Sequence, residues 1–199
     1  MLRKLSCNIL AGGSSSRFGS YKALALLNNK FLIVHIIAKL IPLIPDIVIT
    51  VSNDMQEEML KSAIKEFNVR VVIDKPLGIR AAIVGFYTGL IESRNEYVLQ
   101  VACDMPNISV KCIEYMYRKS INHKYDAVIP KWNNHIEPLH AIYNRERTIK
   151  AVEEALYLDK RLDLRTVIDK IDRKIFIPIG GKCPKESFYN INYKYELPN

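Results

Sequence analysis

The sequence predicts a three-layer α/β fold, in which a mainly parallel sheet carries helices on both faces. Three observations support this prediction. Short β-branched runs alternate with segments of helical periodicity along the first two thirds of the 199 residues. The expected strands are almost continuously apolar, as parallel strands covered on both faces are. The strand–helix–strand order is that of right-handed crossover connections.

The elements of this first part follow from composition and spacing. The expected strands are rich in β-branched residues and cover residues 5–10, 46–51, 69–73, 97–102 and 126–130. The expected helices repeat apolar residues at helical spacing and cover residues 31–40, 54–67, 81–91 and 109–119. Asn53 or Asp54 is expected to cap the second helix and Ser109 the fourth, because short polar side chains accept hydrogen bonds from free N–H groups.

The alternation changes after Lys131. A turn is expected at residues 132–134, followed by a strand over 139–143, helices over 145–158 and 163–171, and a last strand over 174–179. No internal repeat or low-complexity segment divides the chain, so one domain covering residues 1–199 is expected.

The charge and the apolar pattern limit the classes of partner. A net charge of +8 suits nucleic acid, an anionic membrane surface or a small polyanion, and also a plain lysine-rich surface. Basic residues between 145 and 174 alternate with Glu and Asp, which is typical of helix surfaces and not of a nucleic-acid arm. The longest apolar stretch, 31–49, is interrupted by charges and prolines, so neither a membrane span nor a signal peptide is expected, and a cytoplasmic location is predicted.

The four cysteines are scattered along the chain. Cys7, Cys103, Cys112 and Cys183 form no C-x-x-C pair and have no histidine at ligand spacing. A zinc site and a disulfide framework are therefore not expected, and the four residues are interpreted as reduced, mostly buried thiols.

The loop after the first expected strand is the most informative stretch. It joins glycines to two cations, in the order Leu10-Ala11-Gly12-Gly13, Arg17 and Lys22. Glycines let backbone N–H groups approach an anion, and Arg17 and Lys22 add charges that bind phosphate oxygens. The spacing matches neither the P-loop nor the dinucleotide-binding motif. The loop predicts a polyphosphate site, since a purely structural turn needs neither cation.

Other polar residues follow the ends of neighbouring strands. Asn53 and Asp74 follow the second and third strands, and Asp104 follows the fourth. The carboxyl ends of parallel strands share one edge, where ligands bind. An Asp opposite a phosphate loop suits Mg²⁺, and acceptor side chains suit the N1–H and amino donors of guanine. Each of these residues alone is also compatible with a helix cap or a turn.

The loop from Leu10 to Lys22 resembles the motif L-A-G/A-G-x-S-x-R-M-G-x-D-K of nucleotidyltransferases, and the resemblance implies their three-layer Rossmann-like fold. Phe18 replaces the usual Met, and Tyr21 replaces the usual Asp. Leu-Ala-Gly-Gly resembles the molybdenum cofactor guanylyltransferase family, whereas cytidylyl enzymes carry Leu-Ala-Ala-Gly. The absence of a Cβ at Gly12 is expected to leave room for a purine against the loop.

Two central segments extend the resemblance. Residues 103–106, Cys-Asp-Met-Pro, resemble the family's C-D-x-P site, which implies that Asp104 binds Mg²⁺ and the nucleotide. Asn53 and Asp74 occupy positions that resemble nucleotide contacts. The family usually has G-P-L-A-G at residues 78–82. This chain keeps only Gly78 and Ala81 of that motif and adds a cation at Arg80.

The C-terminal part completes the resemblance. Residues 137–143 resemble a Pro-Leu strand of the family, in which His140 is expected to be a structural residue and, as the alternative, a base. Asn190-Ile191-Asn192 resembles the closing N-x-N motif, so Asn190 and Asn192 would bind the acceptor. The helix that usually follows is expected to be short or absent.

The resemblance implies transfer of GMP from GTP to the terminal phosphate of molybdopterin or of the molybdenum cofactor, with Mg²⁺ and release of pyrophosphate. Arg17, Lys22 and Asp104 would be catalytic. CTP as donor and another acceptor, such as a cobinamide or sugar phosphate, remain alternatives, as does a non-catalytic nucleotide- or RNA-binding module. Neither nucleic acid nor a membrane is expected as a partner, and whether a transient partner delivers the cofactor stays open.

Overall fold

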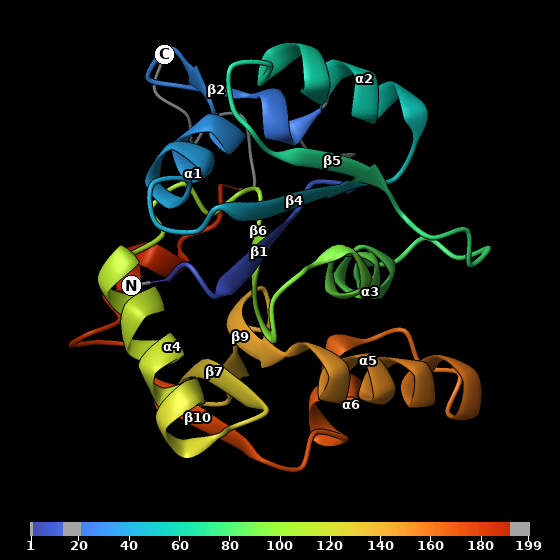
Figure 1. Cartoon of the computed structure of the whole chain (residues 1–199), viewed down its shortest axis with the longest axis vertical. Coiled ribbons are helices and arrows are strands. Elements are labelled where there is room, and N and C mark those ends of the chain that lie inside the picture. The colour runs from blue at the N-terminus through green and yellow to red at the C-terminus, as the bar shows by residue number, and fades with distance from the viewer. Residues whose placement is uncertain (1, 14–20, 192–199) are drawn as a thin grey trace.

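The computed structural model describes residues 2–13 and 21–191, and its main feature is a mixed eight-stranded sheet (Figure 1). The strand order is β10-β7-β9-β6-β1-β4-β5, with β8 beside β7. The strands of this sheet are β1 (Leu5–Leu10), β4 (Asp46–Val51), β5 (Arg70–Ile73), β6 (Tyr97–Ala102), β7 (Ala127–Trp132), β8 (His135–Ile136), β9 (His140–Asn144) and β10 (Lys174–Pro178). A separate hairpin pairs β2 (Leu26–Leu27) with β3 (Lys30–Phe31).

Helices cover both faces of the sheet, which confirms the predicted fold class (Figure 1). The helices are α1 (Leu32–Leu40), α2 (Asp54–Ala63), α3 (Ala82–Glu92), α4 (Val110–His123), α5 (Arg145–Glu153) and α6 (Leu164–Asp169), and the shorter turns are η1 (Lys22–Leu24), η2 (Glu154–Leu158) and η3 (Lys185–Phe188). One core lies under α1, α2 and α4, and a second lies under α3, α5 and α6. No helix within the described ranges is long and apolar enough to cross a membrane.

The strand directions show which edge of the sheet is suited to ligand binding. β1 runs parallel to β4 and β6, β4 to β5, and β10 to β7, whereas β9 runs antiparallel to both β6 and β7. The carboxyl ends of the parallel strands therefore meet the amino end of β9 at a single edge. The change in alternation predicted after Lys131 corresponds to this antiparallel strand.

A polar layer under α3 requires two glycines in that helix. The buried Asn8 of β1 donates to the Gly85 carbonyl at 3.1 Å and to Gln100 Oε1 at 2.7 Å. Gly89 lies so close to Asn8 that an added Cβ would overlap the amide group. A Cβ added at Gly85 would lie 3.1 Å from Thr50 Oγ1 of β4, so α3 packs tightly on β1 and β4 because Gly89 and Gly85 lack side chains.

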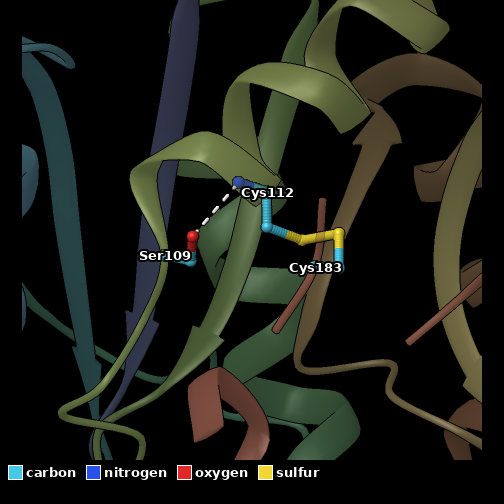
Figure 2. Close-up of a disulfide and its surroundings, with 3 residues drawn as sticks. All are labelled: Ser109, Cys112 and Cys183. Carbon is cyan, nitrogen blue, oxygen red and sulfur yellow. Dashed lines mark hydrogen bonds between the residues drawn. A yellow bond between two sulfur atoms is a disulfide. The ribbon is translucent and has the colours of Figure 1, made fainter. Parts of the chain in front are cut away.

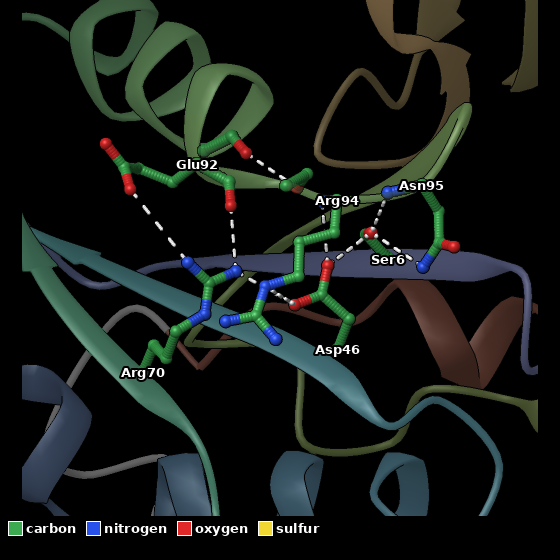
Figure 3. Close-up of polar contacts among 8 residues, drawn as sticks. Ser6, Asp46, Arg70, Glu92, Arg94 and Asn95 are labelled. Atoms are coloured by element: carbon green, nitrogen blue, oxygen red, sulfur yellow. Dashed lines mark hydrogen bonds and ion pairs between the residues drawn. The ribbon is translucent and has the colours of Figure 1, made fainter.

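The amino ends of the strands carry a network of hydrogen bonds at the edge opposite the loop after β1 (Figure 3). Asp46 accepts hydrogen bonds from Ser6, from the Arg70 guanidinium and from the Arg94 N–H at 2.5 to 2.9 Å. Burial opposes ionisation of Asp46, but these donors outweigh it and lower its pKa. The network joins the starts of β1, β4 and β5, so its role is structural.

Element boundaries differ from the prediction mainly at helix ends. The strands predicted at 5–10, 46–51 and 97–102 are confirmed residue for residue. The helix predicted over 54–67 ends at Ala63, and the one predicted over 145–158 changes into a π-helical turn after Glu153. Asn53, Ser109 and Asp163 cap α2, α4 and α6.

The expectation of four reduced cysteines is wrong. Cys112 and Cys183 form a disulfide (Figure 2), whereas Cys7 and Cys103 are free and buried. The cysteines of the pair are 71 residues apart in sequence, and the fold brings their Cα atoms to 4.5 Å. Spacing along the chain gave no sign of this pairing, because the contact depends on how the segment after β10 lies against α4.

Candidate functional site

The loop after β1 lies in the middle of the carboxyl edge. The Ala11 N–H donates to the Thr50 carbonyl at 2.8 Å, and the Cys103 N–H donates to the Leu10 carbonyl at 3.1 Å. The predicted nucleotide-binding residues Leu10 and Ala11 are thus held between the ends of β4 and β6. Arg17 lies outside the described residues, so its predicted role stays a prediction.

Gly12 is required by its protein neighbours. A Cβ added at Gly12 would lie 2.5 Å from Ser52 Oγ and 3.1 Å from Asp74 Oδ2. The Ser52 hydroxyl also donates to the Gly12 carbonyl. Ser52 and Asp74 thus give a reason within the protein for the missing Cβ, and the expected contact of a purine with the loop stays a prediction. A Cβ added at Gly13 meets nothing within 4 Å, so the described surroundings leave space at that position.

Lys22 and Asp104 form an ion pair between the first loop and the end of β6. Lys22 Nζ lies 2.8 Å from Asp104 Oδ2, and only 17% and 18% of the two side chains are exposed. Asp104 Oδ1 is buried and has no hydrogen-bond partner within the described ranges. An unsatisfied carboxylate oxygen beside a phosphate loop fits a divalent cation, since Mg²⁺ in phosphate-transferring sites takes one or two carboxylates plus phosphate oxygens.

Asp74 is a second carboxylate at this edge, on the side of β4 and β5. Its N–H donates to the Val51 carbonyl at 2.8 Å, and its Oδ1 is buried without a partner among residues 2–13 and 21–191. Burial raises the pKa of Asp74 to about 6, although a hydrogen bond from Ser52 opposes the shift. A partly buried acceptor with an open lone pair suits a ligand that brings N–H donors.

Tyr21 fills the position where the sequence pattern usually has Asp. Its hydroxyl is buried and lacks a hydrogen-bond partner within the described part of the chain. Burial, together with the nearby Cys103 and Asp74, raises the pKa of Tyr21, so the phenol is neutral. The position therefore provides a neutral hydroxyl near Asp74 instead of a third carboxylate.

Asn53 is engaged in secondary structure. Its Oδ1 accepts the Gln56 N–H at 3.0 Å and caps α2. The cap predicted from the sequence is confirmed, while a nucleotide contact of Asn53 stays a prediction.

The chain after β10 returns to Asp104. The Ile191 N–H donates to the Asp104 carbonyl at 2.9 Å, which places the exposed Asn190 next to the carboxylate loop. Asn192 lies outside the described residues. The predicted acceptor segment and the predicted metal carboxylate are thus brought together by the backbone.

His140 has a structural environment. It is fully buried, and its ring lies 4.5 Å from the ring of Phe188. Burial lowers the pKa of His140 to about 4, so it is neutral at neutral pH and has no access to solvent. This environment supports the expectation of a structural residue.

Two residues of the edge were not singled out from the sequence. Ser52 directly follows β4. Like Asn53, it is a polar residue after the carboxyl end of a parallel strand, so the same rule predicts it at this edge. Glu137 is half-buried, and burial together with the charge of Asp104 raises its pKa. Glu137 follows the short strand β8 and precedes β9, a position that periodicity did not predict.

Comparison with known proteins shows what this chain is similar to. Residues 7–174 match the model of the MobA-like NTP transferase domain. The probable molybdenum cofactor guanylyltransferase of Pyrococcus horikoshii is 36% identical over 98% of this chain and 97% of its own length. A protein of the same description from Methanosarcina mazei is 28% identical over 98% of this chain and 88% of its own length.

Solved structures show the same arrangement. The molybdopterin-guanine dinucleotide biosynthesis protein A of Archaeoglobus fulgidus superposes with a TM-score of 0.78 at 25% identity, over 94% of this chain and 92% of that chain. The 4-diphosphocytidyl-2C-methyl-D-erythritol synthase of Anaerococcus prevotii superposes with a TM-score of 0.70 at 16% identity, over 96% and 92%. The second likeness concerns the fold alone.

Proposed function

Because this chain belongs to the MobA-like NTP transferase family, we propose that it transfers GMP from GTP to the terminal phosphate of molybdopterin or of the molybdenum cofactor. The observation that carries the proposal is the Lys22–Asp104 pair at the end of the glycine-rich loop. It joins a phosphate-binding cation to a carboxylate with an unsatisfied oxygen at the edge where such sheets bind ligands.

The ion pair suggests how the site accommodates a charged substrate. Without ligand, Lys22 and Asp104 neutralise each other at 2.8 Å. A triphosphate with a divalent cation offers an opposite charge to each of them, so the two residues exchange partners and no buried charge is left unpaired. Asp104 would hold Mg²⁺, which supplies charge neutralisation on the phosphate oxygens.

In the proposed reaction, a phosphate oxygen of the acceptor attacks the α-phosphorus of GTP. A new P–O bond forms, the bond to the β-phosphate bridge breaks, and pyrophosphate leaves with the electron pair. The acceptor phosphate is ionised near neutral pH, so the chain has to align the groups and stabilise charge and needs no strong base. Lys22, with Arg17 and the N–H groups of Gly12 and Gly13, would hold the departing phosphates.

Base and acceptor are assigned to different parts of the edge. Asp74, with its open lone pair, would accept N–H donors from guanine on the β4–β5 side. Asn190, and Asn192 beyond the described residues, would orient the acceptor beside the Asp104 loop. The cytoplasmic setting, and delivery of the cofactor by a transient partner, belong to this proposal.

The proposal is tested by pyrophosphate release from GTP, CTP, ATP and UTP, each with Mg²⁺ and molybdopterin. Release with GTP alone is expected, and Asp104→Ala is expected to lower kcat by about 10²-fold or more, because charge stabilisation in the transition state is lost. Asp172→Asn, an exposed carboxylate away from this edge, serves as the matched control.

Each other outcome corrects a definite part of the proposal. Preference for CTP would refute the assignment of guanine. Turnover only with a cobinamide or sugar phosphate would refute the acceptor. Binding of RNA without turnover of any triphosphate would refute catalysis itself.

A further inference from the structure

The stretch from Ile179 to Ile191 connects β10 to the Asp104 loop with little secondary structure of its own. It contains one β-bridge, between Gly180 and Cys183, and the short turn η3. Within the described residues, two backbone–backbone hydrogen bonds join it to the rest of the protein, one at each end. They run from the Ile179 N–H to the Lys131 carbonyl at 3.1 Å and from the Ile191 N–H to the Asp104 carbonyl at 2.9 Å.

The Cys112–Cys183 disulfide fixes this segment between its two ends (Figure 2). Both cysteines are buried, with at most 1% exposure. Cys112 lies in the first turn of α4, where its N–H donates to Ser109 Oγ at 3.3 Å. α4 is also the helix that follows the Asp104 loop, so the disulfide joins the segment to the element next to the predicted metal carboxylate.

Two apolar contacts hold the far end of the segment. Phe188 is 8% exposed and packs on the buried ring of His140 at 4.5 Å. Ile191 packs against Ala25 and Leu32 at the start of α1. Between these contacts, Tyr189 and Asn190 are exposed. The segment is therefore anchored on both sides of the residue that the proposed function assigns to the acceptor.

We propose that the Cys112–Cys183 disulfide is a positioning tether for acceptor binding, which holds the segment from Gly180 to Ile191 against the Asp104 loop. The proposal rests on the acceptor role given above to Asn190. It assigns to the disulfide a function in substrate affinity in addition to its contribution to stability.

The position of the tether determines which substrate it affects. The proposed donor side is built from residues that follow β1, β4, β5 and β6, and the parallel ladder of these strands holds them in place. The acceptor side depends on a segment with few main-chain bonds, so side-chain anchors have to supply its order. Because both sulfur atoms are buried, thiolates have little access to the bond, so we expect it to exchange slowly with cellular thiols and the tether to persist.

The test compares wild-type protein with Cys112→Ala/Cys183→Ala, using Ile168→Ala as a control. Ile168 is 1% exposed in α6 and belongs to the second core, whereas Cys112, Cys183 and Phe188 belong to the first, and its truncation destabilises the protein by a comparable amount. Three quantities are measured: free thiols in unfolded protein without reductant, hydrogen exchange by mass spectrometry, and the separate KM values for molybdopterin and GTP.

The expected results are specific to the tether. Unfolded wild-type protein should show only the thiols of Cys7 and Cys103. The double variant should exchange faster over residues 184–191, with β1 and β4 still protected. Its KM for molybdopterin should rise roughly tenfold with little change in kcat, as for a segment that holds the binding arrangement a tenth of the time. The KM for GTP should stay within about twofold, since the donor site is outside the tethered segment.

Four thiols in the wild type would overturn the proposal, as would an unchanged KM for molybdopterin in the double variant. Loss of affinity for both substrates, matched by Ile168→Ala, would show a general effect of stability and would also overturn it. If the wild type transfers no GMP, the proposed function fails. The thiol count and the exchange pattern then still decide whether the segment is tethered.

Discussion

Replacing Asp74 with Asn should make the free protein more stable and the nucleotide complex weaker. Burial holds the pKa of Asp74 at about 6, compared with an ordinary value of 3.8. An acid with a raised pKa in the folded state destabilises the fold when it is ionised. The difference corresponds to about 3 kcal/mol, and partial exposure to water reduces it to about 1–2 kcal/mol.

The pH window of this effect follows from the same values. Above pH 6 the folded protein carries the full cost of an ionised Asp74, so Asp74→Asn gains its whole advantage there. As the pH falls from 6 to 3.8, wild-type Asp74 takes up a proton and the cost disappears. The variant should therefore melt about 2–8 °C higher at pH 7.5 and show no advantage near pH 4.

Binding of GTP should change in the opposite direction. An ionised acceptor for the guanine N–H donors is worth about 1.5–3 kcal/mol, so the Kd of the variant for GTP should rise about tenfold to hundredfold. Denaturant unfolding at several pH values and calorimetric titration with GTP measure the two effects, with Asp172→Asn as the control. A variant that is less stable at pH 7.5, or an advantage that persists at pH 4, would refute the reasoning about burial. Unchanged GTP affinity would refute the role in base recognition.

Three further substitutions test the packing of the site and the core. Gly12→Ala should weaken nucleotide binding and lower the free energy of unfolding by about 1–3 kcal/mol, because the added Cβ has no room; wild-type affinity for GTP would contradict this. Gly89→Ala should destabilise by about 2 kcal/mol or more despite the better helix propensity of Ala, because the Cβ overlaps Asn8; a stabilised variant in denaturant unfolding would disprove the close packing. Cys112→Ala/Cys183→Ala should lose about 4 kcal/mol of unfolding free energy, given a separation of 71 residues, and an unchanged melting temperature would argue against the disulfide.

The central strands could be predicted from the sequence because their burial leaves a simple pattern. Residues 5–10, 46–51 and 97–102 are apolar runs covered on both faces, and all three agree with the structure. The end of α2 could not be predicted in the same way. Apolar residues continue at helical spacing to Phe67, but the helix stops at Ala63 and the remaining residues pack in turns. Periodicity reports which side is buried and does not report where the hydrogen-bonded ladder ends.

The site could be predicted as far as the rule for carboxyl ends of strands applies. That rule brought the first loop and Asp104 to one edge, and the structure joins them through the Lys22 ion pair. The reason for Gly12 could not be predicted, because Ser52 and Asp74 reach it only through the pairing of β1 with β4 and of β4 with β5. The disulfide could not be predicted for a similar reason, since it depends on tertiary packing between elements far apart in sequence.

The proposed donor and acceptor sides of the edge are therefore held in place by different kinds of contact. The proposed donor side consists of residues directly after parallel strands, and a missing Cβ at Gly12 lets Ser52 and Asp74 approach the loop. Its geometry is set by the backbone, so a change of base preference requires changes in closely packed residues. The proposed acceptor side combines the antiparallel strand β9 with a segment held through a disulfide, the Phe188–His140 ring contact, the packing of Ile191 and a hydrogen bond at each end. Such a segment can change its sequence without disturbing the sheet. Acceptor preference should therefore vary among proteins of this fold more readily than donor chemistry, and exchange of residues 184–191 between relatives should alter the KM for the acceptor while that for GTP is kept.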